Sequence, residues 1–125
     1  MAITHEEKEF AAYVVELLQD VGPVNSRRMF GGFGIFLDGL MFGLIAENVL
    51  YLKVDDENRA DFEELGMQPF TYDKQGQKMN LSYYQIPDEA MDSMEVMSGW
   101  GNKGFAAALR AAARKKTPKS GRSKR

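Results

Sequence analysis

Apolar residues change from a helical to a strand-like spacing about 20 residues into the chain. Over residues 5–21 they recur at intervals of three and four, which predicts one amphipathic helix with an apolar stripe on the core. Thr4 and Glu7 match a capping box at its start, and Gly22 followed by Pro23 should end it. The residues of the stripe are Phe10, Val14, Leu17 and Val21.

Short apolar runs separated by turn residues then predict a β-sheet. Asp38-Gly39 and Glu47-Asn48 both fit two-residue hairpin turns. The runs beside them are apolar on both faces near their centres, which predicts a sheet covered on part of both sides. Another subunit could cover part of the second side of the sheet. The five expected strands are residues 34–37, 40–46, 49–54, 69–72 and 79–86.

A second helix is expected over residues 56–65. Asp55 would cap it, and Gly66 suits the position just after its end. Phe62 and Leu65 lie on its apolar side, so both are predicted to anchor it in the core. The acidic stretch at its start is better explained by the positive end of the helix dipole than by a metal ion.

A last helical region is expected over residues 88–116. Three glycines between residues 99 and 104 each cost about 1 kcal/mol relative to Ala inside a helix. They predict either a break over residues 99–102 or a helix held together there by tertiary packing of Trp100. Three methionines at helical spacing are expected to fill the core, with an adaptable surface for a partner as the alternative: Met91, Met94 and Met97.

The order of these elements is α-β-β-β-α-β-β-α. Hairpins and short links favour antiparallel pairing, so the sequence predicts an α+β fold with a mostly antiparallel five-stranded sheet. The helices should lie mainly on one face, which gives two layers. We expect one domain over residues 1–113 and a basic tail over residues 114–125, disordered from Thr117 onward.

Composition narrows the classes of function. The chain has 125 residues, 44% of them hydrophobic and 27% charged, as in an ordinary soluble domain. It has no cysteine, which excludes disulfides, thiolate metal sites and cysteine nucleophiles. The first ten residues do not match a signal peptide, and no apolar run approaches the roughly 18 residues of a membrane helix. We therefore expect a cytoplasmic protein without a membrane partner.

Charge is distributed unevenly. Residues 1–113 carry 9 basic and 18 acidic side chains, whereas residues 114–125 carry seven basic side chains and no acid. Such a tail predicts weak, sequence-independent contact with nucleic acid, with a solubilising end as the alternative. The basic residues are Arg114, Lys115, Lys116, Lys119, Arg122, Lys124 and Arg125.

Residues for catalysis or metal binding are scarce. His5 is the only histidine and lies at the start of the first helix, so no catalytic triad or multi-histidine site is expected. Residues 55–57 are acidic but do not have the spacing of a calcium-binding loop. The sequence predicts no catalytic residue, no metal site and no cofactor.

The glycine-rich segment 29–34 is the most unusual local feature. It leads into a strand, whereas a phosphate-binding glycine loop should open a helix. The glycines therefore predict either a backbone bend or a contact surface. Arg27 and Arg28 come just before them and could together hold a carboxylate or phosphate, which is the basis for a small-ligand or enzyme hypothesis.

Three tyrosines lie on the last two expected strands: Tyr72, Tyr83 and Tyr84. Aromatic side chains on a sheet can stack on nucleic-acid bases, but such a platform needs basic neighbours. Because the body of the domain is acidic, packing in the core or at an interface is the better explanation.

Several runs of sequence resemble the N-terminal domain of the TfoX/Sxy regulators of DNA-transformation competence. They are RRMFGGFGIFLDGLMFGLI at 27–45, LYLKVD at 50–55, PFTY at 69–72, LSYY at 81–84, and Trp100. The similarity spans about residues 5–113. It implies the same α+β domain, without catalytic residues, and a role in switching on competence genes together with a DNA-bound activator. The full-length regulators that it resembles carry a second, helical domain, and at that position we expect a basic tail in this sequence.

We therefore expect a non-enzymatic interaction domain in transcription regulation, which binds a protein partner and contacts DNA weakly through its tail. The alternative is a homo-oligomeric scaffold or chaperone-like adaptor, with a homodimer as its simplest form. The expected interaction surface consists of Arg27, Arg28, Phe30, Gly31, Gly32, Lys53, Tyr72 and Tyr83.

Overall fold

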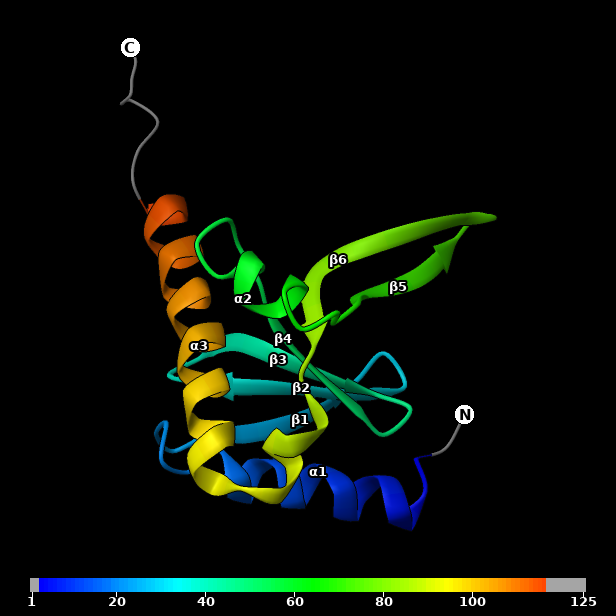
Figure 1. The fold of residues 1–125 in the computed structure, drawn as a ribbon. Helices are drawn as coiled ribbons and strands as arrows, with labels where there is room; N and C mark the ends of the chain where they lie inside the picture. The colour runs from blue at the N-terminus through cyan, green and yellow to red at the C-terminus, as the bar shows by residue number, and fades with distance from the viewer. Residues whose placement is uncertain (1–2, 117–125) are drawn as a thin grey trace.

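A computed structural model describes residues 3–116 of the chain (Figure 1). In chain order, its helices and strands are α1 His5–Leu17, β1 Asn25–Met29, β2 Gly32–Leu37, β3 Leu40–Ala46, β4 Val49–Lys53, α2 Arg59–Glu63, β5 Pro69–Lys74, β6 Gln77–Gln85, a 3₁₀ turn η1 Asp88–Asp92, and α3 Met94–Lys116.

The sheet is antiparallel, as expected, but its strand count differs from the prediction. It contains six strands in the order β1-β2-β3-β4-β6-β5, not five. The prediction missed β1 because its sequence, Asn-Ser-Arg-Arg-Met, has no apolar alternation. Four of its five residues are exposed, since it lies at the edge of the sheet. The α+β class and the order of the other elements are confirmed.

Both predicted hairpin turns are present. Asp38 and Gly39 have φ of +53° and +77°, and Glu47 and Asn48 have φ of +51° and +63°. Two successive positive φ angles match the twist of antiparallel strands in a hairpin. A third turn of this kind, at residues 30–31, joins β1 to β2 with φ of +43° and +79°. The glycine-rich segment therefore forms a hairpin turn and the strand that follows it.

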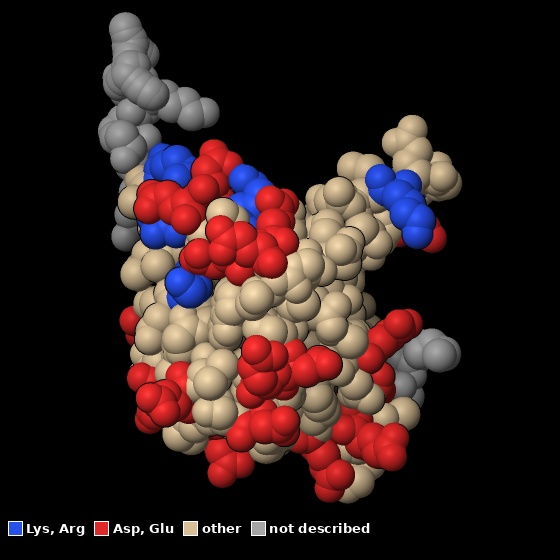
Figure 2. Space-filling model, in the orientation of Figure 1, with Lys and Arg blue, Asp and Glu red and all other residues tan. Residues whose placement is uncertain are grey.

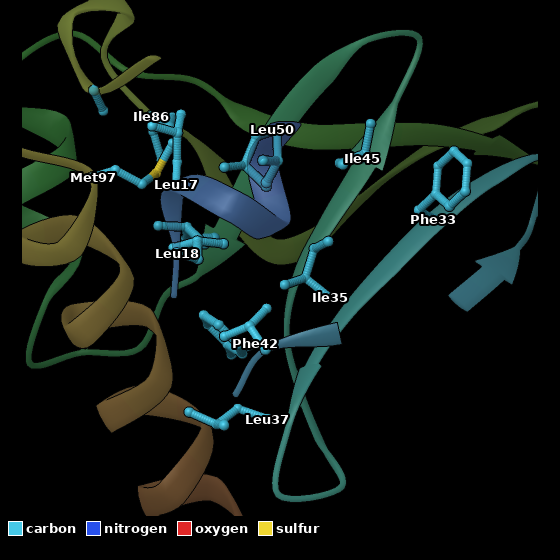
Figure 3. Packing of buried hydrophobic residues seen from close by; sticks show 14 of the residues in the cluster. Leu17, Leu18, Phe33, Ile35, Leu37, Phe42, Ile45, Leu50, Ile86 and Met97 are labelled. Carbon is cyan, nitrogen blue, oxygen red and sulfur yellow. The ribbon is translucent and has the colours of Figure 1, made fainter. Parts of the chain in front are cut away.

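The helices pack on one face of the sheet, which gives the expected two layers (Figure 1). Their buried side chains form one core with alternate residues of the strands (Figure 3). From β2, for example, Phe33, Ile35 and Leu37 face this core, while the residues between them face the other way. Phe42 of β3 meets Phe105 of α3 edge-on, with ring centroids 5.5 Å apart.

A β-bulge interrupts the pairing of β2 and β3. Ile35 pairs with Gly43 and Phe36 pairs with Met41, so Phe42 is the extra residue of β3. Phe42 is fully buried in the core. The bulge therefore lets β3 place this large side chain under α3.

The first two helices are shorter than predicted. α1 ends at Leu17, and residues 18–21 continue as turns. α2 covers only residues 59–63. Phe62 is fully buried, as expected, but Leu65 is 51% exposed, so its assignment as a core anchor was wrong. Leu65 lies beyond the end of the short helix, where the helical spacing that predicted its burial no longer applies.

The last helical region divides at Ser93 into η1 and α3, and α3 continues through all three glycines. Of the two alternatives, tertiary packing is therefore the one observed, and Trp100 packs on Phe62 with ring centroids 4.8 Å apart. Of the methionines, Met97 is buried and Met91 packs against the core, whereas Met94 is 39% exposed. α3 includes residues 114–116, and the rest of the expected tail lies outside the described residues.

Glycine substitutions in α3 should show which positions need close packing. A Cβ at Gly101 would lie 2.6 Å from Leu18 Cδ2 and 2.9 Å from Val21 Cγ2, whereas a Cβ at Gly99 would meet no atom within 4 Å. We expect Gly101→Ala to lower the free energy of unfolding by about 1–2 kcal/mol. We expect Gly99→Ala to raise it by up to about 1 kcal/mol, through helix propensity. Urea unfolding followed by circular dichroism measures both, and equal effects would contradict this packing.

Candidate functional site

The face of the sheet that the helices leave uncovered contains an apolar groove of about 360 Å³. The outer part of the β5–β6 hairpin projects from the body (Figure 1). Tyr72 and Leu81 of this hairpin line one side of the groove. We call this projecting part, residues 71–82, the arm. The groove is lined by Phe30, Met41, Leu44, Phe70, Tyr72 and Leu81.

Apolar side chains around the groove remain open to solvent. Phe30 is 55% exposed, and Tyr72 and Leu81 are each 38% exposed. Isolated exposed apolar residues are common on proteins, but neighbouring ones around a concave surface are typical of binding sites. The groove is therefore the main candidate for an interaction surface.

Local structure explains how these residues come together. Phe30 occupies the β1–β2 turn, where its positive φ points the chain back into β2. Phe70 at the base of the arm packs on Tyr51 of β4, with ring centroids 5.0 Å apart, and lies 6.3 Å from the ring of Tyr72. These contacts place the arm beside β3 and β4, although the β1–β2 turn and the arm are about 40 residues apart in sequence.

A second hollow of about 390 Å³ borders the groove. Phe30 and Phe70 line both hollows, and the second also contains Gly31, Tyr51 and the carboxylate-bearing Glu47. The two hollows thus share a wall, and together they extend from the arm to the β3–β4 turn.

The two arginines before the glycine segment lie on opposite faces of the sheet. Arg27 pairs with Gly34, and its guanidinium lies 4.0 Å from the ring centroid of Phe36, on the uncovered face. Arg28 is the next residue of the same strand and therefore points to the other face. The geometry does not support one anion site that uses both, although each remains exposed at the edge of the sheet.

Three other predicted surface residues have different environments. Gly32 lies in β2, where an added Cβ would overlap the backbone of Ile45 in β3. Tyr83 is only 9% exposed, its hydroxyl is 3.5 Å from the Met41 carbonyl oxygen, and burial raises its pKa to about 12. Lys53 lies half-buried at the end of β4, with its ammonium 5.2 Å from the Tyr83 ring. Tyr83 thus packs in the sheet and presents little surface to a partner.

Tyr84 points to the opposite face, toward α2. Its ring lies 6.0 Å from that of Phe62, and its hydroxyl donates to Glu63 Oε2 at 2.8 Å. Tyr72, Tyr83 and Tyr84 therefore do not form one aromatic platform. The preference for packing over nucleic-acid stacking is confirmed for Tyr83, which is buried.

Ion pairs hold the segment before α2 against the end of α3. Arg110 donates to both carboxylate oxygens of Asp55, at 2.6 and 2.9 Å, and the Asp55 side chain also accepts from the backbone of Glu57 and Asn58. The Arg110 hydrogen bond is the main reason that the pKa of Asp55 falls to about 2. Asp55 therefore closes the turn before α2, whose N-cap is Asn58.

The other chemically interesting residues are isolated. His5 is exposed and lies 3.1 Å from Glu9 on the same helix. Within residues 3–116, no three His, Cys, Asp or Glu side chains form a group that could hold a metal ion. In the same range, no helix has the length and apolar character required to cross a membrane.

The described part of the basic tail continues the last turn of α3. Arg114 and Lys115 are exposed there, and Lys116 is its last helical residue. The side chain of Lys116 and the whole of Lys119, Arg122, Lys124 and Arg125 lie outside the described part of the chain. In Figure 2, Lys and Arg lie near the end of α3, where acidic groups are interspersed with them, and at the tip of the arm, whereas acidic groups predominate over the lower body.

Sequence reasoning named two groove residues, Phe30 and Tyr72, and missed the other four. Met41 and Leu44 belong to the strands whose apolar residues on both faces predicted that the sheet is covered on part of both sides. Phe70 and Leu81 were assigned to strands without a surface role. Their convergence depends on the position of the arm relative to β3, which the spacing of apolar residues does not encode.

These features define a two-layer α+β domain with an open apolar groove on the uncovered face of its sheet. Residues 16–108 match the family model of the TfoX N-terminal domain. The chain therefore belongs to the TfoX N-terminal domain family, as its sequence motifs predicted.

Two relatives support this assignment. The chain is 34% identical over 86 residues to the DNA transformation protein TfoX1 of Aliivibrio fischeri, which covers 69% of the chain and 39% of the relative. It is 26% identical over 76 residues to Protein Sxy of Escherichia coli, which covers 61% of the chain and 36% of the relative. The matched region thus spans well under half the length of either relative.

Proposed function

We propose that this domain is a non-enzymatic regulator of DNA-transformation competence that acts by binding a protein partner. The relative from Aliivibrio fischeri is named a DNA transformation protein, which supports a role in transformation competence. The main observation in favour of action by protein binding is the apolar groove, because three of its six lining residues are exposed to solvent. A partner that fills it would remove this apolar area from water.

The chemistry of the groove favours one kind of partner segment. Its walls are aromatic and aliphatic, so the segment needs apolar side chains that insert between them. Arg27 lies on the same face, and Lys74 and Lys78 lie at the tip of the arm. We therefore infer a partner segment with apolar anchors flanked by acidic residues, belonging to a component of the transcription apparatus.

A pair of charge-introducing substitutions tests this proposal. Leu81→Glu places a carboxylate in the groove, whereas Leu109→Glu makes the same change on the exposed side of α3, where Leu109 is 49% exposed. We expect Leu81→Glu to weaken partner capture from extract of the source cell by at least about tenfold, because burying the new charge is unfavourable. Leu109→Glu should capture the partner like the unmodified chain.

The same variants should differ in the cell. Transcripts of competence genes should fall with Leu81→Glu and stay unchanged with Leu109→Glu. The proposal is supported if the unmodified chain captures a transcription component, and if Leu81→Glu reduces both this capture and the competence-gene transcripts. Equal capture by both variants contradicts it. Light scattering tests the alternative of a homo-oligomeric scaffold. This alternative would be favoured if the full chain is a dimer, if Leu81→Glu converts it to a monomer, and if no transcription component is captured.

A further inference from the structure

β5 is an edge strand whose outer side has no partner strand. Within residues 3–116 it pairs with β6 alone, and all residues of the arm, 71–82, are exposed. A two-stranded ribbon is marginally stable in water, and a third strand stabilises it. The other edge strand, β1, carries two adjacent arginines, which oppose strand addition, whereas residues 70–72 are Phe-Thr-Tyr and favour it.

The turn at the tip of the arm determines which backbone groups of β5 point outward. Residues 75–76 have φ of +53° and +84°, so they form a two-residue hairpin turn closed by Lys74 and Gln77, which bond to each other. Hydrogen-bonded and non-hydrogen-bonded pairs alternate along an antiparallel ladder. The N–H and C=O groups of Thr71 and Asp73 therefore point away from β6, toward the free edge.

The side chains of β5 alternate between the two faces of the arm. Phe70 and Tyr72 line the groove, and Lys74 follows two residues later on the same face. Met79 of β6 pairs with Tyr72 and is 37% exposed, so it extends the apolar part of this face. None of the ion pairs within residues 3–116 includes Lys74. The groove side of β5 thus presents two aromatic rings followed by an unpaired cation.

The two hollows on the uncovered face lie along β5. Phe70 lines both of them, Tyr72 lines the groove, and Thr71 lines the second hollow. Residues of the β1–β2 and β3–β4 turns also line the second hollow. Figure 2 shows an open notch between the arm and the lower body. An added strand would therefore lie between β5 and these turns.

We propose that a partner protein adds an antiparallel strand to the free edge of β5. This inference rests on the proposed protein-binding function and specifies how the partner segment is held. Thr71 and Asp73 would exchange backbone hydrogen bonds with it, and antiparallel pairing is the more stable orientation. Partner side chains opposite Phe70, Tyr72 and Lys74 share the face of these residues. From its N-terminus, the segment therefore has an acidic residue, an apolar residue two positions later, and another two positions after that.

Charge and hydrogen bonding disfavour a second copy of this chain as the partner. Thr71 and Asp73 are the bonded positions, so two β5 strands pair either like residue with like or Thr71 with Asp73. Pairing Asp73 with itself brings two carboxylates together, and pairing Thr71 with itself sets Asp73 against Pro69, which has no N–H. Pairing Thr71 with Asp73 sets Lys74 opposite Phe70, which leaves this cation without a carboxylate.

A synthetic peptide tests the mode of binding without the natural partner. The probe contains Glu-Thr-Phe-Thr-Val, which matches the inferred pattern, and NMR follows amide hydrogen exchange in the full chain. At saturating peptide, we expect the amides of Thr71 and Asp73 to exchange at least about fivefold more slowly. The amides of Lys78 and Asn80 are matched controls that should not change, because these residues pair with Asp73 and Thr71 but point to the other edge of the arm.

Equal protection at both edges of the arm, or none at either, would overturn the proposal. A peptide with Lys in place of Glu should bind more weakly, by up to about fivefold, the effect of one exposed ion pair with Lys74. Equal affinity of the two peptides would overturn the inferred acidic position.

Paired proline substitutions extend the test to the natural partner. Thr71→Pro removes an N–H at the free edge of β5, and Asn80→Pro removes one at the other edge of the arm, where proline is tolerated. We expect Thr71→Pro to weaken peptide binding and partner capture about tenfold, because it leaves a partner carbonyl unpaired. Asn80→Pro should change neither.

These outcomes separate the inference from the proposed function. If Leu81→Glu abolishes capture while Thr71→Pro and Asn80→Pro both retain it, groove binding stands and strand addition is overturned. If the peptide binds with the expected pattern but no transcription component is captured, strand addition stands and the proposed function is contradicted. A dimer of the full chain that Thr71→Pro dissociates and Asn80→Pro preserves would overturn the assignment to a separate partner.

Discussion

Replacing Gly32 by Ala is expected to lower the free energy of unfolding by about 3 kcal/mol, near the upper end of the cost of overpacking. An added Cβ would overlap the carbonyl oxygen of Ile45 and would lie 3.2 Å from its carbonyl carbon. Both atoms belong to the backbone of the neighbouring strand, so relief requires β2 and β3 to move apart. Such a movement would disturb the core, because Phe33 and Ile45 are both buried there.

Gly34→Ala is the matched control in the same strand. Its added Cβ would meet the Met29 sulfur at 2.6 Å and the Phe36 ring at 2.8 Å, which are side-chain atoms. Met29 is 38% exposed and can rotate away, so we expect a loss of about 1 kcal/mol. Urea unfolding of both variants measures the difference. A Gly32→Ala protein as stable as Gly34→Ala would show that the two strands are not packed this closely.

Replacing Asp55 by Ala is expected to lower the free energy of unfolding by about 3 kcal/mol. The substitution leaves the partly buried Arg110 guanidinium without its two carboxylate hydrogen bonds. It also removes the acceptor for the backbone of Glu57 and Asn58 in the turn before α2. Asp56→Ala is the control, because the Asp56 side chain is 97% exposed in its ion pair with Arg59 and should contribute well under 1 kcal/mol.

The same carboxyl predicts a dependence of stability on pH. The pKa of Asp55 is about 2 in the folded domain, below its ordinary value of 3.8. A lowered folded-state pKa stabilises the protein fully above the unfolded pKa, and this contribution is lost as pH falls through the folded pKa. Between pH 5 and pH 2, the unmodified chain should therefore lose about 2 kcal/mol more than Asp55→Ala. Identical losses in both proteins would show that Arg110 does not hold this carboxylate.

Local features of the fold could be predicted because their causes are local. The turn at Asp38-Gly39 depends on two residues that tolerate positive φ, and Asn48 is such a residue in the turn at Glu47-Asn48, so the sequence displays both turns directly. The capping box at Thr4 and Glu7 is likewise present as expected. The strand over residues 25–29 could not be found this way, since an exposed edge strand needs no apolar alternation.

The candidate sites depend on contacts between distant segments and could be predicted only in part. The excess of apolar residues at Met41 and Leu44 indicated a second cover for the sheet, but not that the arm would provide one wall of a groove. Arg110 and Asp55 are 55 residues apart, and no pattern along the chain pairs them.

The bulge in β3 links the interior of the domain to its outer surface. In a regular strand, residues three apart point in opposite directions, so Met41 and Leu44 could not both line one groove. The unpaired Phe42 between them shifts the alternation by one position, and both side chains then reach the uncovered face. A single inserted residue thus supplies an aromatic ring to the interior and a two-residue floor to the groove. Deleting one residue here would remove both at once.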